Sequence, residues 1–230
     1  EYVETYIPDS FPGLEVDGDL SSFQSTVDNF RSLTNDYYTI KPPTEITSKV
    51  NPVINDYIFI DGDVFLNNKN LTVNEGYTLV IDGNLTTDRN CTINGNIIIN
   101  GDFIIEGRNR DSRNIVGTFY VNGDVSIVRK TTIGSPSRPS FMFSTGTVTG
   151  ANQVTIYGFF IADAFYGSYG NTFVTGGVYT TNETIVKNSN VTTYDDLTTE
   201  DLINYGVATT IVVESTSGTS SFTFTYPNLE

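Results

Sequence analysis

Apolar and polar residues alternate in short runs along most of the chain after residue 57, and glycine corners interrupt these runs. The repeated unit is apolar, any, apolar, Asp or Asn, Gly, Asp or Asn, followed by a second apolar alternation. It occurs at 58–66, 79–85, 91–97, 97–105 and 119–127. Alternation with a period of two is typical of half-buried strands. Asp-Gly and Asn-Gly are typical of tight corners that require a positive φ.

The central glycines of these units are Gly62, Gly83, Gly95, Gly101 and Gly123, so most intervals are about 20 residues or a simple fraction of it. Repeats near this length favour a solenoid, in which each coil buries apolar side chains against its neighbours. Asn-Gly between alternating strands is also a hairpin signal, so an antiparallel meander, sandwich or barrel stays open. The repeat interval leads us to predict an all-β chain folded as a parallel β-helix, or β-solenoid.

The two ends of the chain show other patterns. Leu20, Phe23, Val27, Phe30 and Leu33 recur at intervals of three and four, which predicts an amphipathic helix that covers an edge or an end of the following structure. Residues 194–206 predict a second short helix, and 207–213 with 222–226 predict a hairpin. We therefore expect a lead-in and capping helix over 1–56, a solenoid over 57–194, and a C-terminal helix and β-hairpin over 195–230.

Composition and charge exclude several functions. The chain has 12 Lys and Arg against 27 Asp and Glu, a net charge of −15, which disfavours nucleic acids and anionic membranes as partners. It has no His and a single Cys, Cys91, so imidazole zinc sites, Ser-His or Cys-His catalysis and intrachain disulfides are excluded. The longest aliphatic run, 97–99, is far shorter than the roughly 20 residues of a membrane span. We expect an extracellular protein without membrane contact in this part of the chain.

Carboxylates are the most numerous reactive groups. Corners such as Asp61 and Asp63 could offer oxygens to Ca²⁺, but their spacing matches neither an EF-hand loop nor the glycine-rich nonapeptide repeat. We expect instead that each corner side chain hydrogen-bonds its own turn, and that the chain has no metal site and no cofactor. The segment 107–114, which includes Arg113, is interpreted as a loop that leaves the stack.

A carbohydrate-active β-helix enzyme is the alternative function. A glycosidase needs two carboxylates at a defined separation, and the residues that could supply them are Asp163, Asp195, Asp196, Glu200 and Asp201. A lyase also needs a basic residue, for which the candidates near the repeats are Arg129, Lys130 and Arg138. Nothing in the sequence brings these groups together, so we expect a non-enzymatic protein, with a polysaccharide lyase or hydrolase, or a glycan-binding module, as the alternative.

Aromatic residues are the richest binding candidates, because rings on a flat β surface stack on sugars or anchor protein partners. The candidate ligand- or partner-binding residues are Tyr157, Phe165, Tyr166, Tyr169 and Tyr179. Phe159, Ile161 and Phe173 are expected in the core. An ice-binding surface would need a flat face of stacked threonines, and Thr86, Thr92 and Thr118 keep no fixed offset in the repeat.

The corner sequences also resemble a known family. The run Ile-Asp-Gly-Asp-Val, Ile-Asp-Gly-Asn-Leu, Ile-Asn-Gly-Asn-Ile, Ile-Asn-Gly-Asp-Phe and Val-Asn-Gly-Asp-Val is similar to Gram-positive surface proteins described as type IV pilus assembly accessory, or PilX-like, proteins. The similarity spans about 57–197. It implies a right-handed β-solenoid that acts as a structural or adhesive module on a pilus or the cell surface, with other pilus or surface proteins, or glycans, as partners. It implies no catalytic residues.

Overall fold

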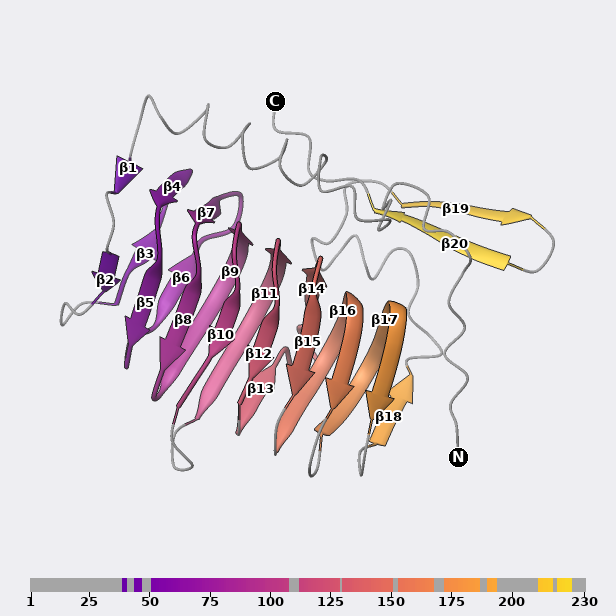
Figure 1. Ribbon diagram of the computed structural model, residues 1–230. Coiled ribbons are helices and arrows are strands. Elements are labelled where there is room, and N and C mark those ends of the chain that lie inside the picture. Colours follow the sequence, from indigo (N-terminus) through magenta and orange to yellow (C-terminus); the bar gives the residue numbers. More distant parts are fainter. Residues whose placement is uncertain are drawn as a thin grey trace.

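The structure is a computed structural model that describes residues 39–40, 44–46, 51–107, 112–128, 130–150, 153–167, 172–186, 190–193, 211–216 and 219–224. The helices predicted at 20–33 and 194–206 lie outside these residues. Within the described residues, 18 strands form one sheet whose coils stack in parallel as a right-handed β-solenoid (Figure 1). This confirms the predicted fold class and excludes the antiparallel alternative for the repeats.

The strands are short in most coils and merge into long bent strands in the last ones. They are β1 (Thr39–Ile40), β2 (Thr44–Ile46), β3 (Val53–Ile54), β4 (Ile58–Asp61), β5 (Val64–Asn67), β6 (Leu71–Val73), β7 (Thr78–Asp82), β8 (Leu85–Asp88), β9 (Cys91–Ile99), β10 (Phe103–Ile105), β11 (Arg113–Val121), β12 (Val125–Ile127), β13 (Thr131–Ile133), β14 (Ser140–Ser144), β15 (Thr147–Gly150), β16 (Val154–Gly167), β17 (Thr172–Val186) and β18 (Asn190–Thr193).

Each coil runs through three faces, and each strand pairs in parallel with the strand of the same face in the next coil. Face A contains β1, β4, β7, the second halves of β9 and β11, β14, and the middle of β16 and β17. Face B contains β2, β5, β8, β10, β12, β15 and the ends of β16 and β17. Face C contains β3, β6, the first halves of β9 and β11, β13, the starts of β16 and β17, and β18. Among the described residues, the stacking already includes Thr39 and Thr44, which lie before the expected solenoid start at 57.

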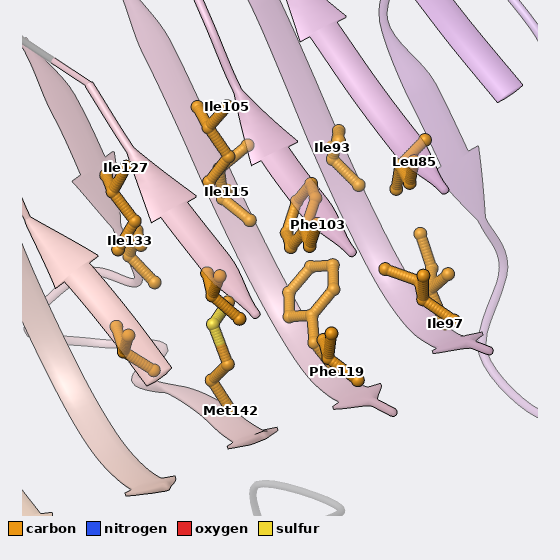
Figure 2. Close-up of a cluster of buried hydrophobic side chains, with 14 of the residues drawn as sticks. Leu85, Ile93, Ile97, Phe103, Ile105, Ile115, Phe119, Ile127, Ile133 and Met142 are labelled. Atoms are coloured by element: carbon orange, nitrogen blue, oxygen red, sulfur yellow. The ribbon is translucent and has the colours of Figure 1, made fainter. Parts of the chain in front are cut away.

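Alternate side chains from all three faces point inward and fill the solenoid (Figure 2). Phe103 of face B and Phe119 of face A stack inside it, with ring centroids 5.5 Å apart. Ile93, Ile115 and Ile133 form an inward column on face C. Each inward side chain thus contacts the equivalent side chains of the coils before and after it, so the core is a set of continuous apolar columns.

A column of glycines forms the corner between faces A and B: Gly62, Gly83, Gly101, Gly123 and Gly146. A Cβ built on Gly101 would lie 2.6 Å from the carbonyl oxygen of Gly83, and one on Gly123 would lie 2.6 Å from that of Gly101. Gly62 has a positive φ, but Gly83, Gly101 and Gly123 do not. The expectation that positive φ requires these glycines was therefore wrong for most of the corner, where the close approach of successive coils requires them.

A second glycine column forms the bend between faces C and A, where Gly95, Gly117, Gly158 and Gly176 have φ values of 122°, 142°, 141° and 138°. Ser140 takes the position between Gly117 and Gly158. Its hydroxyl accepts a hydrogen bond from the Gly117 backbone N–H and donates one to the Ile115 carbonyl. The two overlapping repeat units in the sequence thus correspond to two different bends of the same coil.

Side-chain ladders join the coils at the corner between faces A and B. Oδ1 of Asp63 accepts the backbone N–H of Asn84, and the same contact continues from Asn84 to Asp102, Asp102 to Asp124 and Asp124 to Thr147, at 2.7 to 2.9 Å. These residues are 18 to 23 positions apart. The expectation that each corner side chain bonds its own turn was therefore wrong, because the acceptor bonds the next coil.

A second ladder lies two residues earlier in the repeat, at the residue before the corner glycine. Nδ2 of Asn100 donates to Asp82, Nδ2 of Asn122 donates to Asn100, and Oγ1 of Thr145 donates to Asn122, at 2.6, 2.7 and 3.1 Å. Each interior member of this ladder must donate and accept, which an amide does and an ionised carboxylate does not. Asp and Asn are therefore not interchangeable at this position.

Strands β19 (Ile211–Thr216) and β20 (Thr219–Phe224) pair antiparallel, with Ile211 opposite Phe224 and Thr216 opposite Thr219. This confirms the predicted C-terminal hairpin. Its strands differ from the predicted ranges by a few residues, since the pairing continues to Thr216 and Thr219.

Replacing Gly101 by Ala tests the steric requirement at the corner. The added methyl would meet backbone atoms of Gly83, which cannot move without separating two coils, so we expect a loss of about 1–3 kcal/mol in the free energy of unfolding. The matched control is Gly150→Ala, whose Cβ would meet its nearest atom at 3.8 Å. Urea unfolding should show a change of at most about 1 kcal/mol for the control. Equal losses in the two variants would contradict the steric argument.

Replacing Asn100 by Asp tests the need for a donor in the ladder. The new carboxylate cannot donate to Asp82 and stands beside it as a like charge, so the free energy of unfolding at pH 7 should fall by about 1–3 kcal/mol. Asp102→Asn is the control, since an amide oxygen can still accept the Asp124 N–H. The proposed roles of the two ladders would be contradicted if Asn100→Asp left the free energy of unfolding unchanged while Asp102→Asn lowered it.

Candidate functional site

The outward side of face C carries two columns of uncharged side chains along the solenoid. These columns alternate with the inward isoleucines of this face, and together we call them the face C surface. The members of the surface are Thr72, Asn94, Val116, Tyr157 and Thr175 in one column, and Thr92, Asn114, Thr132, Thr155 and Phe173 in the other. None of these residues is charged, in a chain with a net charge of −15. Several acidic residues, among them Asp63, Asp102 and Asp124, lie instead at the corner between faces A and B.

Two exposed apolar side chains lie near opposite ends of face C. Phe173 is 42% exposed and Val53, at the start of the same face, is 53% exposed; they are the large exposed hydrophobic residues of the described chain. Tyr157 is half-buried. In the register of β16 and β17, Phe173 lies opposite Thr155 and Tyr157 lies opposite Thr175. The two aromatic residues are therefore diagonal neighbours on adjacent coils, with Cα atoms about 8 Å apart for ideal strand spacing.

The structure does not bring the predicted aromatic site together. Tyr157 lies on face C, Tyr166 points outward from face B and is half-buried, and Phe165 points inward and is fully buried. The prediction that Phe165 contacts a ligand was wrong, because it occupies the core column of Val148. Tyr169 lies outside the described residues. The backbone of Tyr179 pairs with Ile161 on face A, and its side chain is not described.

The structure places the three residues expected in the core, Phe159, Ile161 and Phe173, outside the solenoid interior. Phe173 is not in the core, because Val174 is the inward residue and alternation turns Phe173 outward. Ile161 is buried, but it points away from the solenoid interior on face A. Phe159 is half-buried and stacks on Phe141 with ring centroids 5.5 Å apart. Counting alternation from the glycine bends would have found Phe173, since two residues separate it from Gly176 just as two separate Asn114 from Gly117.

Threonines are frequent on face C, but they do not form a regular array. Thr92 lies on face C, Thr86 on face B and Thr118 on face A, so these three residues belong to different surfaces. Within the face C surface, Asn114 interrupts the column of Thr92 and Thr132. This irregular mixture of hydroxyl, amide and aromatic groups fits hydrogen bonding and ring stacking better than it fits a lattice-matched surface.

Acidic and basic candidates for catalysis are dispersed among the described residues. Asp163 accepts a hydrogen bond from the Asn182 amide at 2.5 Å, and Lys130 and Arg138 are exposed. The other four candidate carboxylates and Arg129 lie outside the described residues. No group of three or more His, Cys, Asp or Glu side chains able to hold a metal ion occurs in the part of the chain that the structure describes. No helix there has the length and hydropathy of a membrane span.

Cys91 and Arg113 form a buried polar pair that the sequence did not reveal. Arg113 lies in β11, fully buried and in register with Cys91, so its assignment to a loop that leaves the stack was wrong. Its Nε donates to the Glu106 carbonyl at 2.5 Å. Burial raises the pKa of the Cys91 thiol, against the opposing effects of the Thr87 hydroxyl and the Arg113 guanidinium. A protonated, enclosed thiol is a poor nucleophile, so this pair is structural.

In comparisons with known proteins, no family model, no curated protein and no solved structure matched the chain.

The raised pKa of Cys91 predicts an alkaline loss of stability. The unfolded thiol loses its proton near the ordinary value of 9.0, before the folded thiol does, so this contribution is complete below pH 9 and falls as pH rises through the folded pKa. We expect the difference in free energy of unfolding between wild type and Cys91→Ala to shrink above pH 9. Urea unfolding across the pH range measures it, and parallel curves for the two proteins would contradict the shift.

Proposed function

We propose that this protein is a non-enzymatic structural and adhesive β-solenoid displayed outside the cell, on a pilus or another bacterial surface structure, and that its face C surface contacts an uncharged polysaccharide. The observation that carries the proposal is the absence of charge from the two outward columns of face C, together with the exposure of Phe173. The resemblance of the corner repeats to pilus accessory proteins supports the location.

The chemistry of the face C surface suits a neutral glycan. Threonine hydroxyls and asparagine amides both donate and accept hydrogen bonds, as sugar hydroxyls do. The rings of Phe173 and Tyr157 offer flat apolar surfaces of the kind that stack on sugar rings. Because the chain is strongly acidic, an anionic glycan would be repelled by the corner carboxylates.

The scaffold is also suited to adhesion in mechanical terms. Parallel backbone pairing connects each coil to the next across the described solenoid, and two side-chain ladders add contacts between the coils from Asp63 to Thr147. The outward columns of face C are held by strands whose opposite side is packed in the core. Binding groups on such a surface lose little conformational freedom when a ligand docks, which favours affinity.

Retention on insoluble cellulose, chitin and starch tests the proposal. Wild type should be retained on at least one of them, and Phe173→Ala and Tyr157→Ala should each lose about tenfold or more in affinity, which corresponds to about 1.4 kcal/mol. The matched control is Tyr166→Ala, which removes a half-buried ring from face B and should bind as wild type. Retention of wild type on none of the three, or unchanged retention of Phe173→Ala, would contradict the assignment of face C.

The enzymatic alternative is tested with the same materials. Incubation of the protein with neutral and acidic polysaccharides, with and without Ca²⁺, should release no reducing ends and no unsaturated products. Product release by wild type would replace the adhesive proposal with the enzymatic one.

A further inference from the structure

One outward column of face A differs from the outward columns of faces B and C because it is apolar and buried. This column contains Phe59, Val80, Ile98, Tyr120, Phe143 and Ile161. Their exposed fractions lie between 0% and 9%. We call this column the face A stripe. The rings of Tyr120 and Phe143 stack within it, with centroids 4.9 Å apart and an interplanar angle of 8°.

The face A stripe cannot be buried by the solenoid core. Ile97 and Ile99, on either side of Ile98, point inward and are fully buried, so alternation turns Ile98 away from the core. Faces B and C lie on the core side of these strands and do not reach the outer side. The equivalent outward column of face B, from Phe65 through Thr86, Ile104, Ser126 and Thr149 to Tyr166, is half-buried or exposed. Face A is therefore covered by chain outside the solenoid strands.

The sequence contains a segment of suitable chemistry. Leu20, Phe23, Val27, Phe30 and Leu33 form the apolar side of the amphipathic helix predicted before β1, which we call the N-terminal segment. Its other side is polar, with Ser22, Ser25 and Asn29. Such a helix must pack its apolar side against an apolar surface to be stable in water. The face A stripe is a surface of this kind.

We propose that the N-terminal segment packs along the face A stripe and closes this side of the solenoid. Connectivity favours it, because β1 pairs with β4 in face A and the chain that precedes Thr39 therefore enters the solenoid at this face. Length favours it as well. A helix over 20–33 is about 21 Å long, and the five steps from β4 to β16 span about 24 Å at the usual strand spacing.

The proposal also accounts for the shape of the stripe. Its members are large, and bulky rings such as those of Tyr120 and Phe143 lie in successive coils. A continuous apolar line on successive coils matches the continuous apolar line of a helix that runs along the solenoid axis. A helix that crossed the coils at right angles would cover one or two of these positions and leave the others exposed.

A double-mutant cycle in the full chain tests the contact. Phe30→Asp should detach the N-terminal segment, and Ile98→Asp should do the same from the solenoid side, so each variant should lower the midpoint of urea unfolding. The double variant should have a midpoint close to that of the worse single variant, because both changes remove the same contact. Ser25→Asp and Ser126→Asp are the matched controls, on the polar side of the segment and on face B, and should leave the midpoint near that of wild type.

Additive losses in the cycle would overturn the proposal. Two other occupants give distinct results that also overturn it. If the losses of Ile98→Asp and Leu202→Asp were non-additive while those of Ile98→Asp and Phe30→Asp were additive, the C-terminal part of the chain would be the segment that covers the stripe. A wild-type dimer in sedimentation equilibrium that Ile98→Asp converts to a monomer, with additive losses, would assign it to a second copy. If an Asp variant fails to fold, the milder pair Phe30→Ala and Ile98→Ala carries the same cycle.

Discussion

The close approach of successive coils at the glycine corners is the constraint on which the rest of the structure depends. Parallel strands pair only when their backbones lie about 4.8 Å apart, and at a bend this leaves no room for a side chain that points toward the next coil. Gly83, Gly101 and Gly123 meet that requirement at one bend, and Gly117 and Gly158 meet it at another. Any Cβ at these positions would contact backbone of the neighbouring coil. The bends therefore keep every coil at the same spacing.

The ladders beside the corner convert this spacing into a defined register. A backbone N–H is the donor in the ladder of Asp63, Asn84, Asp102 and Asp124, so an acid and an amide serve equally well there. In the ladder of Asp82, Asn100 and Asn122, the side chains donate to one another, so the acid stands at the start and amides follow. A slip of one residue would break both ladders and turn the core columns outward. The polar corners and the apolar core thus specify the same register.

Much of this architecture could be predicted from the sequence, because both the strand period and the corner residues are local signals. The Asn-Gly-Asp and Asp-Gly-Asn corners, with apolar alternation on both sides, predict coiled strands. The sequence did not separate Gly95 from Gly101, since a glycine at a bend between faces C and A looks the same as one at the corner between faces A and B. The sequence also did not predict that Arg113 lies in a strand, because a charged residue next to a loop has the same local pattern as a residue within that loop. Both errors concern residues whose environment is set by the neighbouring coil, and the local sequence pattern does not reveal that contact.

The aromatic residues show why surface chemistry was harder to predict than the fold. Phe159, Phe165 and Phe173 all lie within a few residues of a glycine, yet they lie on the outer side of face A, in the core and on the outer side of face C. Their placement depends on the number of residues between each ring and the nearest glycine bend. A shift of one position exchanges core for surface without changing composition.

The division between inward columns and outward surfaces explains how one chain can combine opposite surface properties. Stability resides in the inward columns and in the contacts at the bends, so outward residues are free to differ from face to face. The face C surface has no charged side chain and includes the exposed Phe173, face A has a buried apolar stripe, and the corner between faces A and B carries Asp63, Asp102 and Asp124. Asp102 and Asp124 lie one coil apart in the corner ladder, and each accepts a backbone N–H of the following coil. Part of the negative charge of the chain is thus carried by groups that join its coils, while the face C surface has no charged side chain.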